Sequence, residues 1–358
     1  MSDGPGWNPP GPWPPPGQGG YGAPWPPPAP KPGVIPLRPV SMGEILDGSI
    51  ATIRRNPRAT LGFTAIVMAA STAITTLLAA RELPGLSRVS AHTRAGQPLT
   101  KADVTSLGGW LVTYGVVTLL LGLAVTVILT GTLTAVVGRA VLGEQITAGQ
   151  AWRQARIGAL ARLVLLLIGI FVLVWAVLIG VPLLGSLASG PVGVALAIPA
   201  LIAAVPLTIF LWVKTSLAAS VVVLERANAT AAIGRSWRLT RRSFWRVFGI
   251  WVVAYLAIFV AGLVLEIPFR LIAGVVSGTG GLGLSAPPAL AGGKLLLYLT
   301  IGAVGSLVAA TITRPMVAGV AALLYVDLRM RREGLDIALQ AAAGQPPDTM
   351  WRAPPADR

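Results

Sequence analysis

Long stretches without a charged residue alternate with short basic segments along this chain. Residues 61–80, 110–138, 163–213, 247–265 and 295–313 contain no Asp, Glu, Lys or Arg. A helix of about 20 apolar residues crosses a bilayer core, so each run is long enough to span, and 163–213 is long enough to span twice. Pro and Gly near the middle of that run predict a turn. The pattern predicts an all-α polytopic membrane protein with six transmembrane helices, at about 61–80, 110–133, 163–182, 194–213, 247–267 and 295–314.

Composition agrees with a membrane protein. Hydrophobic residues make up 54% of the 358 residues and charged residues only 11%, with a mean hydropathy of +0.73; soluble domains carry about 25% charged residues. The chain has no cysteine, which excludes disulfides, thiolate chemistry and Cys-ligated metals. The first forty residues hold no apolar signal-peptide core, so we expect residues 61–80 to act as an uncleaved signal-anchor.

The basic residues are distributed unevenly between the two sides of the six expected spans. The net charge is +15, and 21 of the 28 Lys and Arg residues fall on one side. Cytoplasmic loops carry the excess of Lys and Arg, so both termini are expected to be cytoplasmic in the cell membrane. The basic side consists of residues 1–60, 139–162, 214–246 and 327–358, and the opposite side of 81–109, 184–192 and 266–294.

An internal repeat links the basic segments to the spans that follow them. Residues 44–63, 148–165 and 231–250 are similar, and each enters an odd-numbered span. The returning spans also match, with Lys214 equivalent to Arg314. We therefore expect three parallel helical hairpins, each preceded by an amphipathic cytoplasmic helix, whereas many secondary transporters use inverted repeats. The equivalent positions of the basic segments are Ile50, Trp152 and Trp237, followed four residues later by Arg54, Arg156 and Arg241.

The segment GRSWRLTRRSFWRVFGIW, residues 234–251, contains five arginines and three tryptophans. As one continuous helix it would place Trp237, Phe244, Phe248 and Trp251 in one stripe, with most arginines opposite. Such a helix suits the headgroup boundary, where Trp is enriched and each basic residue near an anionic leaflet contributes about 1 kcal/mol. The alternative is that the arginines only fix topology and the aromatics pack on neighbouring helices. The candidate lipid-contact residues are Arg54, Trp152, Arg156, Arg235, Trp237, Arg238, Arg241 and Arg242.

Two cations are expected at the inner edge of the bilayer. Lys214 and Arg314 each follow a run just long enough to span. A charge at membrane depth often marks a functional site, but snorkelling to the inner headgroups is the favoured interpretation. Pro315 is expected to kink the last helix. The long returning helices would then project beyond the membrane and pack with the amphipathic helices as a cytoplasmic collar.

The two ends of the chain differ from the middle. Residues 1–36, rich in Pro, Gly and Trp, are expected to be a disordered tail with polyproline II character, and 341–358 a shorter one, so that 37–340 form the membrane domain. The first tail is either a plain solvated segment or a docking ligand for a protein partner that recognises proline.

The sequence contains few residue patterns that would indicate catalysis. The single histidine, His92, falls in the expected outer loop 81–109, where a solvated loop residue is the favoured interpretation. No carboxylate pair or nucleophile–base arrangement is evident, and Glu266 is expected to pair with Arg270. The glycines of residues 278–283 match GxGxxG without the required βαβ context. We predict that the protein is not an enzyme and has no cofactor or metal, and nucleic-acid binding is not expected, because the basic pattern recurs beside three membrane entries.

Three stretches resemble a known family: IPLRPVSMGEILDGSIATIRRNPRATLG, VVLERANATAAIGRSWRLTRRSFWRVFGI and ALLYVDLRMRREGLD. They are similar to an actinobacterial family of integral membrane proteins related to the membrane domain of glycerophosphoryl diester phosphodiesterases. The resemblance covers about residues 35–340. It implies a membrane module without the catalytic domain, one that brings proteins near glycerophospholipids or their products, and it assigns no functional residues.

Two functions follow as hypotheses. The first is a non-enzymatic membrane protein that contacts anionic phospholipid and organises partners at its cytoplasmic face. The alternative is a transporter or lipid-moving permease with a cavity between the helical repeats. The polar residues available for such a cavity are chiefly Thr113, Thr126, Thr130 and Thr134, although their spacing also suits helix packing.

Overall fold

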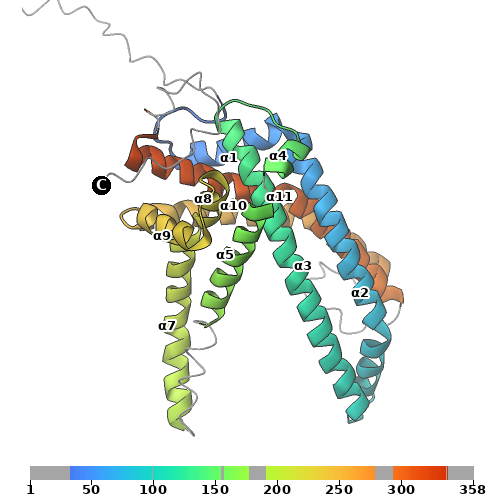
Figure 1. Ribbon diagram of the computed structural model, residues 1–358. Helices are drawn as coiled ribbons and strands as arrows, with labels where there is room; N and C mark the ends of the chain where they lie inside the picture. The colour runs from blue at the N-terminus through green and yellow to red at the C-terminus, as the bar shows by residue number, and fades with distance from the viewer. Residues whose placement is uncertain are drawn as a thin grey trace, which may run out of the picture.

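The computed structural model describes residues 33–98, 100–154, 157–176, 191–278, 293–335 and 337, and all regular structure within them is helical (Figure 1). A π-helical turn, η1, at Arg58–Gly62 leads directly into the second helix. The α-helices are α1 (Met42–Arg55), α2 (Phe63–Arg94), α3 (Lys101–Val141), α4 (Ala148–Gln154), α5 (Ile157–Trp175), α7 (Pro191–Thr215), α8 (Ala218–Leu224), α9 (Ala229–Thr240), α10 (Phe244–Ser277) and α11 (Gly293–Glu333).

Several of these helices are long and apolar enough to cross a membrane. Within the described residues there are five such segments. Helices of this length and apolar composition in the described part of the chain are those of a membrane protein. The third expected span, 163–182, corresponds only in part to the shorter apolar segment Ala161–Trp175, because residues 177–182 lie outside the described part. The five segments are Arg58–Arg81, Lys101–Val141, Ile202–Leu224, Phe244–Ser277 and Gly293–Glu333.

Helices extend past the ends of the charge-free runs. The expected outer loop 81–109 is mostly helical, since α2 continues to Arg94 and α3 begins at Lys101. A capping box starts α3: the Asp103 backbone N–H donates to Thr100 Oγ1 (3.2 Å), and the Thr100 N–H donates to Asp103 Oδ2 (2.9 Å). Likewise α10 continues beyond Glu266 to Ser277. Charged residues therefore end the apolar runs here without ending the helices.

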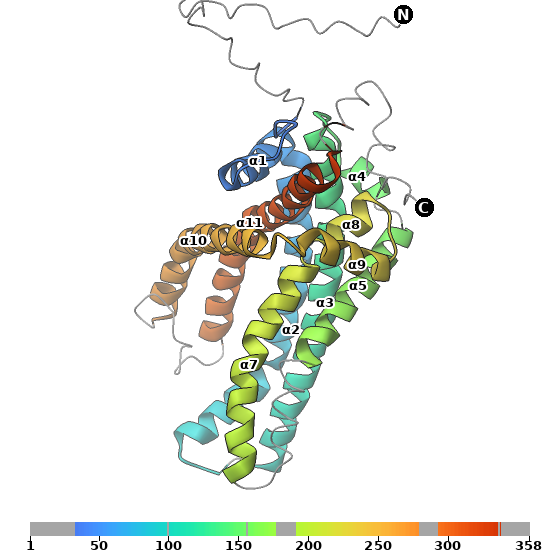
Figure 2. The ribbon, with the colours of Figure 1, turned by 90° about the vertical axis from the view of Figure 1, so that its left-hand side faces the viewer.

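The buried core lies at one end of the molecule (Figures 1 and 2). There the ends of α3 and α11, the start of α10 and the short helices α1, α4, α8 and α9 pack together; we call this assembly the collar. Away from the collar, α2, α3, α5 and α7 extend as legs with exposed apolar side chains, such as Leu77 and Ile202 at 71% and 68% exposure. Apolar surface of this extent suits contact with lipid.

The segment that precedes α1 belongs to the collar. Residues 33–41, which we call the strap, carry the buried side chains Val34, Ile35, Leu37 and Val40. The Val34 N–H donates to the Ala140 carbonyl at the end of α3 (3.1 Å). The packed part of the chain thus begins before the expected boundary at residue 37. The remainder of the expected Pro-rich tail and the expected tail 341–358 lie outside the described residues.

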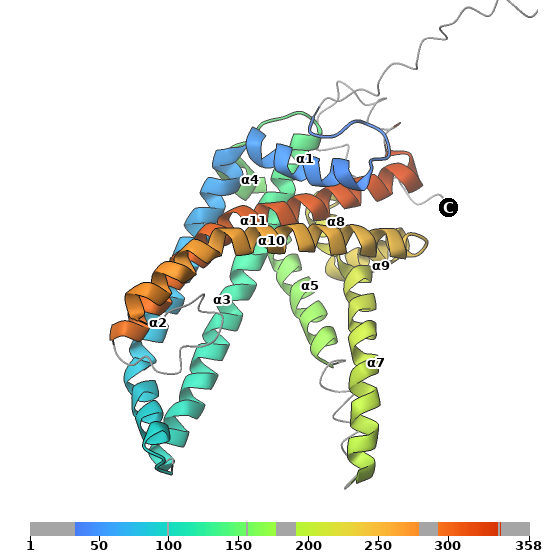
Figure 3. The same cartoon turned by 180° about the vertical axis from the view of Figure 1, so that it is seen from behind.

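Helices α10 and α11 run side by side, and α1 crosses α11 on the collar (Figure 3). A Cβ atom at Gly319 would lie 2.7 Å from Ser49 Cβ and 3.1 Å from Ser49 Cα. Helix α11 stays continuous through Pro315, whose side chain is buried. The close approach of α1 to α11 therefore depends on the missing side chain at position 319.

Replacing Gly319 by alanine is expected to destabilise the fold by about 1–3 kcal/mol, because the new methyl group forces α1 away from α11. The measurement is the midpoint of thermal unfolding in detergent. Gly302→Ala in the same helix is the matched control, because a Cβ atom there meets nothing within 4 Å. Equal midpoints for the two variants would contradict the proposed close packing.

Candidate functional site

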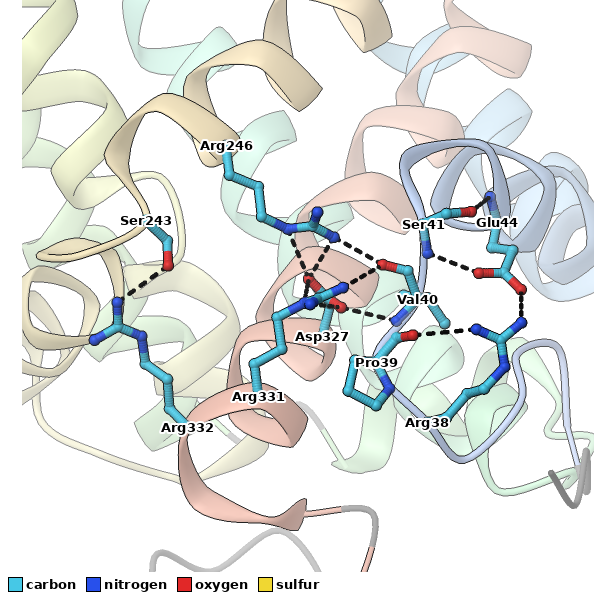
Figure 4. Close-up of polar contacts among 10 residues, drawn as sticks. All are labelled: Arg38, Pro39, Val40, Ser41, Glu44, Ser243, Arg246, Asp327, Arg331 and Arg332. Atoms are coloured by element: carbon cyan, nitrogen blue, oxygen red, sulfur yellow. Dashed lines mark hydrogen bonds and ion pairs between the residues drawn. The ribbon is translucent and has the colours of Figure 1, made fainter. Parts of the chain in front are cut away.

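The basic segment 234–251 forms two helices instead of the single one expected. Helix α9 ends at Thr240, and α10 begins at Phe244 after a turn whose residue Ser243 has φ −127° and ψ 22°. The Thr240 hydroxyl donates to the Ser236 carbonyl (2.9 Å) and Ser243 Oγ accepts from Arg332 Nη2 (3.0 Å; Figure 4). A hydroxyl that donates to the carbonyl four residues earlier slightly destabilises a helix and often bends it. The predicted single aromatic stripe was therefore wrong.

The arginines of this region divide into two groups. Arg238, Arg241 and Arg242 are exposed around the turn, as is Arg54 in the last turn of α1. Within the described residues, no ion pair or hydrogen bond involves the guanidinium groups of these four. Arg156 lies outside the described part of the chain. The exposed arginines remain available for a ligand from outside the fold.

Arg235 belongs to the second group, the arginines held inside the collar. Its side chain is 16% exposed, and its guanidinium lies 2.7 Å from the Glu225 carboxylate and 2.8 Å from Glu333 Oε2. Burial by itself would lower the pKa of Arg235, but the bond to Glu225 and the charge of Glu333 raise it above the usual value. Arg235 thus links α9 to α11 and is not a surface contact.

The Glu225 carboxylate is the centre of a buried polar cluster. It accepts a hydrogen bond from the Tyr325 hydroxyl, and Arg329 Nη1 donates to the same hydroxyl oxygen (3.2 Å). Arg329 Nε in turn donates to Glu333 (2.9 Å). Sequence reasoning missed this cluster, although VVLERA and LLYVDLR place charged residues directly after apolar runs.

A second buried carboxylate, Asp327, fixes the strap. Its side chain is 0% exposed, and Oδ1 accepts from the Val40 N–H (2.9 Å). Arg246 and Arg331 both donate to Asp327 and to the Val40 carbonyl, at 2.7–3.1 Å through their closest atoms. Figure 4 shows the two guanidinium groups converging on the carboxylate from α10 and α11. The strap, α10 and α11 are joined at this point.

The tryptophans also divide between surface and core. Trp152 is 41% exposed on α4 and Trp237 is 37% exposed on α9, with its ring edge-on to Phe210 at 5.7 Å. Trp245 at the start of α10 is 78% exposed and was not among the predicted contacts, whereas Trp251 is 3% exposed. Trp237 and Trp245 therefore lie on either side of the turn that carries Arg241 and Arg242, whereas Trp152 lies on α4.

Lys214 does not extend to the surface as the snorkelling interpretation expected. It is 4% exposed in the last turn of α7, and its Nζ lies 5.4–5.9 Å from the ring centroids of Phe210, Trp237 and Phe244. These are cation–π distances. Because the rings belong to α7, α9 and α10, the buried ammonium group holds three helices together.

Arg314 lines a cavity of about 270 Å³ between the helices, which is open on one side. The three threonines Thr126, Thr130 and Thr134 of α3 also line it, while Thr113 does not. The other residues around the cavity are Leu129, Leu133, Leu167, Ile170, Trp212, Thr215, Ser216, Ala219, Ser220, Trp251, Tyr255, Val317, Ala318 and Ala321.

Two further expectations concern polar residues of α10 and α2. Glu266 and Arg270 form the expected ion pair on α10 (2.8 Å). His92 is not a solvated loop residue: it lies in α2, and its Nδ1 is 2.8 Å from Asp103 Oδ2. No group of three or more His, Asp or Glu residues that suits a metal occurs within the described residues.

Comparison with known proteins assigns the chain to a family. Comparisons with curated proteins and with solved structures found no match. Residues 41–328 match a family model described as a domain of unknown function (DUF7847). The matched range begins at the N-cap of α1 and includes Asp327, the turn 241–243 and the whole cavity. The chain therefore belongs to the DUF7847 family.

Proposed function

We propose that this protein binds anionic phospholipid through the basic surface of its collar and organises partners there. The observation that carries the proposal is the set of exposed arginines without a partner among the described residues, next to exposed tryptophans. Arginines inside the collar are satisfied by Glu225, Glu333 and Asp327, so the exposed ones are not required for those ion pairs. The proposed contact residues are Arg54, Arg238, Arg241 and Arg242, with Trp152, Trp237 and Trp245.

The position of this surface supports the proposal. Trp237 contacts Phe210 of α7, a helix that continues into an apolar leg. Interfacial tryptophans lie at headgroup depth, and each arginine near an anionic leaflet contributes about 1 kcal/mol. We place the collar on the cytoplasmic side, with six spans arranged as three hairpins and both termini inside. The resemblance to a phosphodiesterase membrane domain supports a non-enzymatic module of this kind.

The expected result of Arg238→Ala/Arg241→Ala/Arg242→Ala is weaker retention of anionic lipid. Each lost charge is expected to lower affinity about fivefold at low salt, less as salt screens the surface. The measurement is native mass spectrometry of protein released from nanodiscs that contain phosphatidylglycerol and phosphatidylcholine.

The matched control is the variant Arg81→Ala/Lys101→Ala/Lys294→Ala, which removes three exposed cations that lie away from the collar. This control changes net charge equally, so a larger loss of lipid in the collar variant would separate the collar surface from a general effect of charge. Unchanged retention in the collar variant would mean that its arginines act only on topology.

A transporter or lipid-moving permease is the second candidate. It is favoured by one observation: Thr126, Thr130 and Thr134 line a cavity among the helices. The three threonines border this open space, and the Thr126 hydroxyl also donates to the Gly122 carbonyl of its own helix (2.7 Å). Uptake of a labelled lipid by proteoliposomes would separate this candidate from the first.

A further inference from the structure

The floor of the Arg314 cavity contains two buried polar groups without a hydrogen-bond partner. They are the Ser220 hydroxyl on α8, in a residue 1% exposed, and the Trp251 indole N–H on α10, in a residue 3% exposed. Buried polar groups are nearly always paired, with protein, water or ligand. Other unpaired groups occur in the described residues, but both of these residues line the same cavity, and the indole N–H can only donate.

The cation at the cavity has no counter-ion. Within the described residues no ion pair or hydrogen bond involves the Arg314 guanidinium, and none of the residues lining the cavity is an Asp or Glu. Arginine within an apolar helix pairs with a partner or marks a ligand pathway. A guanidinium group, an indole N–H and the hydroxyls of Ser220 and Tyr255 together present a surface dominated by donors, which suits an oxyanion.

The cavity also has apolar walls and an open side. Arg314 is exposed and Tyr255 is 41% exposed, whereas Leu133, Ser220 and Trp251 at the floor are buried. The open side therefore lies away from this floor, where α3 and α10 carry exposed apolar side chains, such as Leu119 and Leu120 on α3 and Leu256 and Phe259 on α10. A volume of about 270 Å³ is just below the range of small-molecule pockets, about 300–1,000 Å³, so a compact group fits.

We propose that this cavity binds the phosphate group of an amphipathic ligand, with Arg314, Trp251 and Ser220 donating to its oxygens and the apolar part lying along the legs. The site uses none of the exposed arginines of the collar. It is thus independent of the proposed surface contact, and it concerns binding whether or not the ligand is moved. A phospholipid and a free phosphate share the recognised chemistry, and the following test distinguishes them.

The experiment titrates the full chain in uncharged detergent with dioctanoyl phosphatidylglycerol, with dioctanoylglycerol, and with inorganic phosphate. Titration at about 0.3 M salt suppresses binding at the exposed surface. Arg314→Gln is expected to raise the Kd for the phospholipid at least tenfold, because it removes a charged donor to the phosphate. Trp251→Phe is expected to raise the Kd about fivefold, because it removes an uncharged donor. Dioctanoylglycerol, which lacks the phosphate, is expected to bind more weakly and without dependence on Arg314.

Matched controls are Arg81→Gln and Trp175→Phe, which make the same chemical changes at exposed positions outside both the proposed collar surface and the cavity, and they are expected to leave the Kd within about twofold at this salt. If Arg314→Gln does not fold, Trp251→Phe and Ser220→Ala carry the test. A Kd for the phospholipid that is unchanged in the cavity variants would overturn the proposal. If inorganic phosphate binds as tightly as the phospholipid and its binding is lost in Arg314→Gln, the cavity is an anion site, and the proposal that its ligand is amphipathic is overturned.

Discussion

Replacing Asp327 by asparagine is expected to lower the free energy of unfolding by about 3 kcal/mol and to release the strap. Breaking a buried ion pair costs about 3–5 kcal/mol, and the lower end applies because Arg246 and Arg331 are 35% and 36% exposed and can be partly rehydrated. The amide of asparagine can still accept from the Val40 N–H, but its NH₂ group then faces two guanidinium groups. The measurement is denaturant unfolding in detergent, combined with hydrogen exchange of the strap.

Asp47→Asn is the matched control for this prediction. Asp47 is exposed on α1, and its loss is expected to change stability by less than about 0.5 kcal/mol. Faster exchange of the Val40 amide in Asp327→Asn, with no change in Asp47→Asn, would show that the carboxylate holds the strap. Equal stability of the two variants would mean that Asp327 does not hold the collar together.

The spans were predictable because lipid imposes a simple requirement on composition, whereas helix ends depend on local hydrogen bonds. Residues 63–80 are an apolar part of α2, but nothing in the apolar run indicates that the helix continues to Arg94. Conversely, the break between α9 and α10 interrupts a pattern that fits one helix. At this break the Ser243 hydroxyl oxygen accepts a hydrogen bond from Arg332, a residue far along the chain.

The candidate surface was predictable in part, since repeated Trp and Arg beside apolar runs indicated the exposed groups at Arg54, Trp152 and Arg238. The sequence could not separate these from Arg235, because Glu333, one of the two partners of Arg235, lies on α11, nearly 100 residues away. Lys214 was misjudged for the same reason. Its three aromatic neighbours come from separate helices, and only packing brings Phe210, Trp237 and Phe244 around one ammonium group.

Two carboxylate clusters thus hold the collar together. Asp327 joins the strap to α10 and α11. Glu225, the residue that follows α8, pairs with Arg235 of α9, which also pairs with Glu333 of α11. Both act through α11, so the last helix organises segments from the start and the middle of the chain. The cavity lies among the same helices, and its walls therefore depend on this arrangement.

Replacing Glu225 by glutamine is expected to destabilise the protein by about 3–5 kcal/mol, near the full cost of breaking a buried ion pair. The side chains of Glu225 and Arg329 are only 4% and 3% exposed. Water therefore cannot solvate the arginine charge that would be left without its carboxylate partner. One oxygen of glutamine can still accept from Tyr325, but its NH₂ group then opposes the Arg235 guanidinium.

Glu144→Gln is the matched control for Glu225→Gln, because Glu144 pairs with Arg139 at 2.6 Å while 39% exposed. An exposed pair of this kind contributes about 0–1 kcal/mol. Denaturant unfolding of both variants in detergent gives the comparison, and a double-mutant cycle with Tyr325→Phe measures the coupling of Glu225 to its nearest neighbour. A loss in Glu225→Gln no greater than in Glu144→Gln would show that the buried cluster is not what joins α9 to α11. A large loss with strong coupling would place the stability of the collar, and with it the walls of the cavity, on this carboxylate.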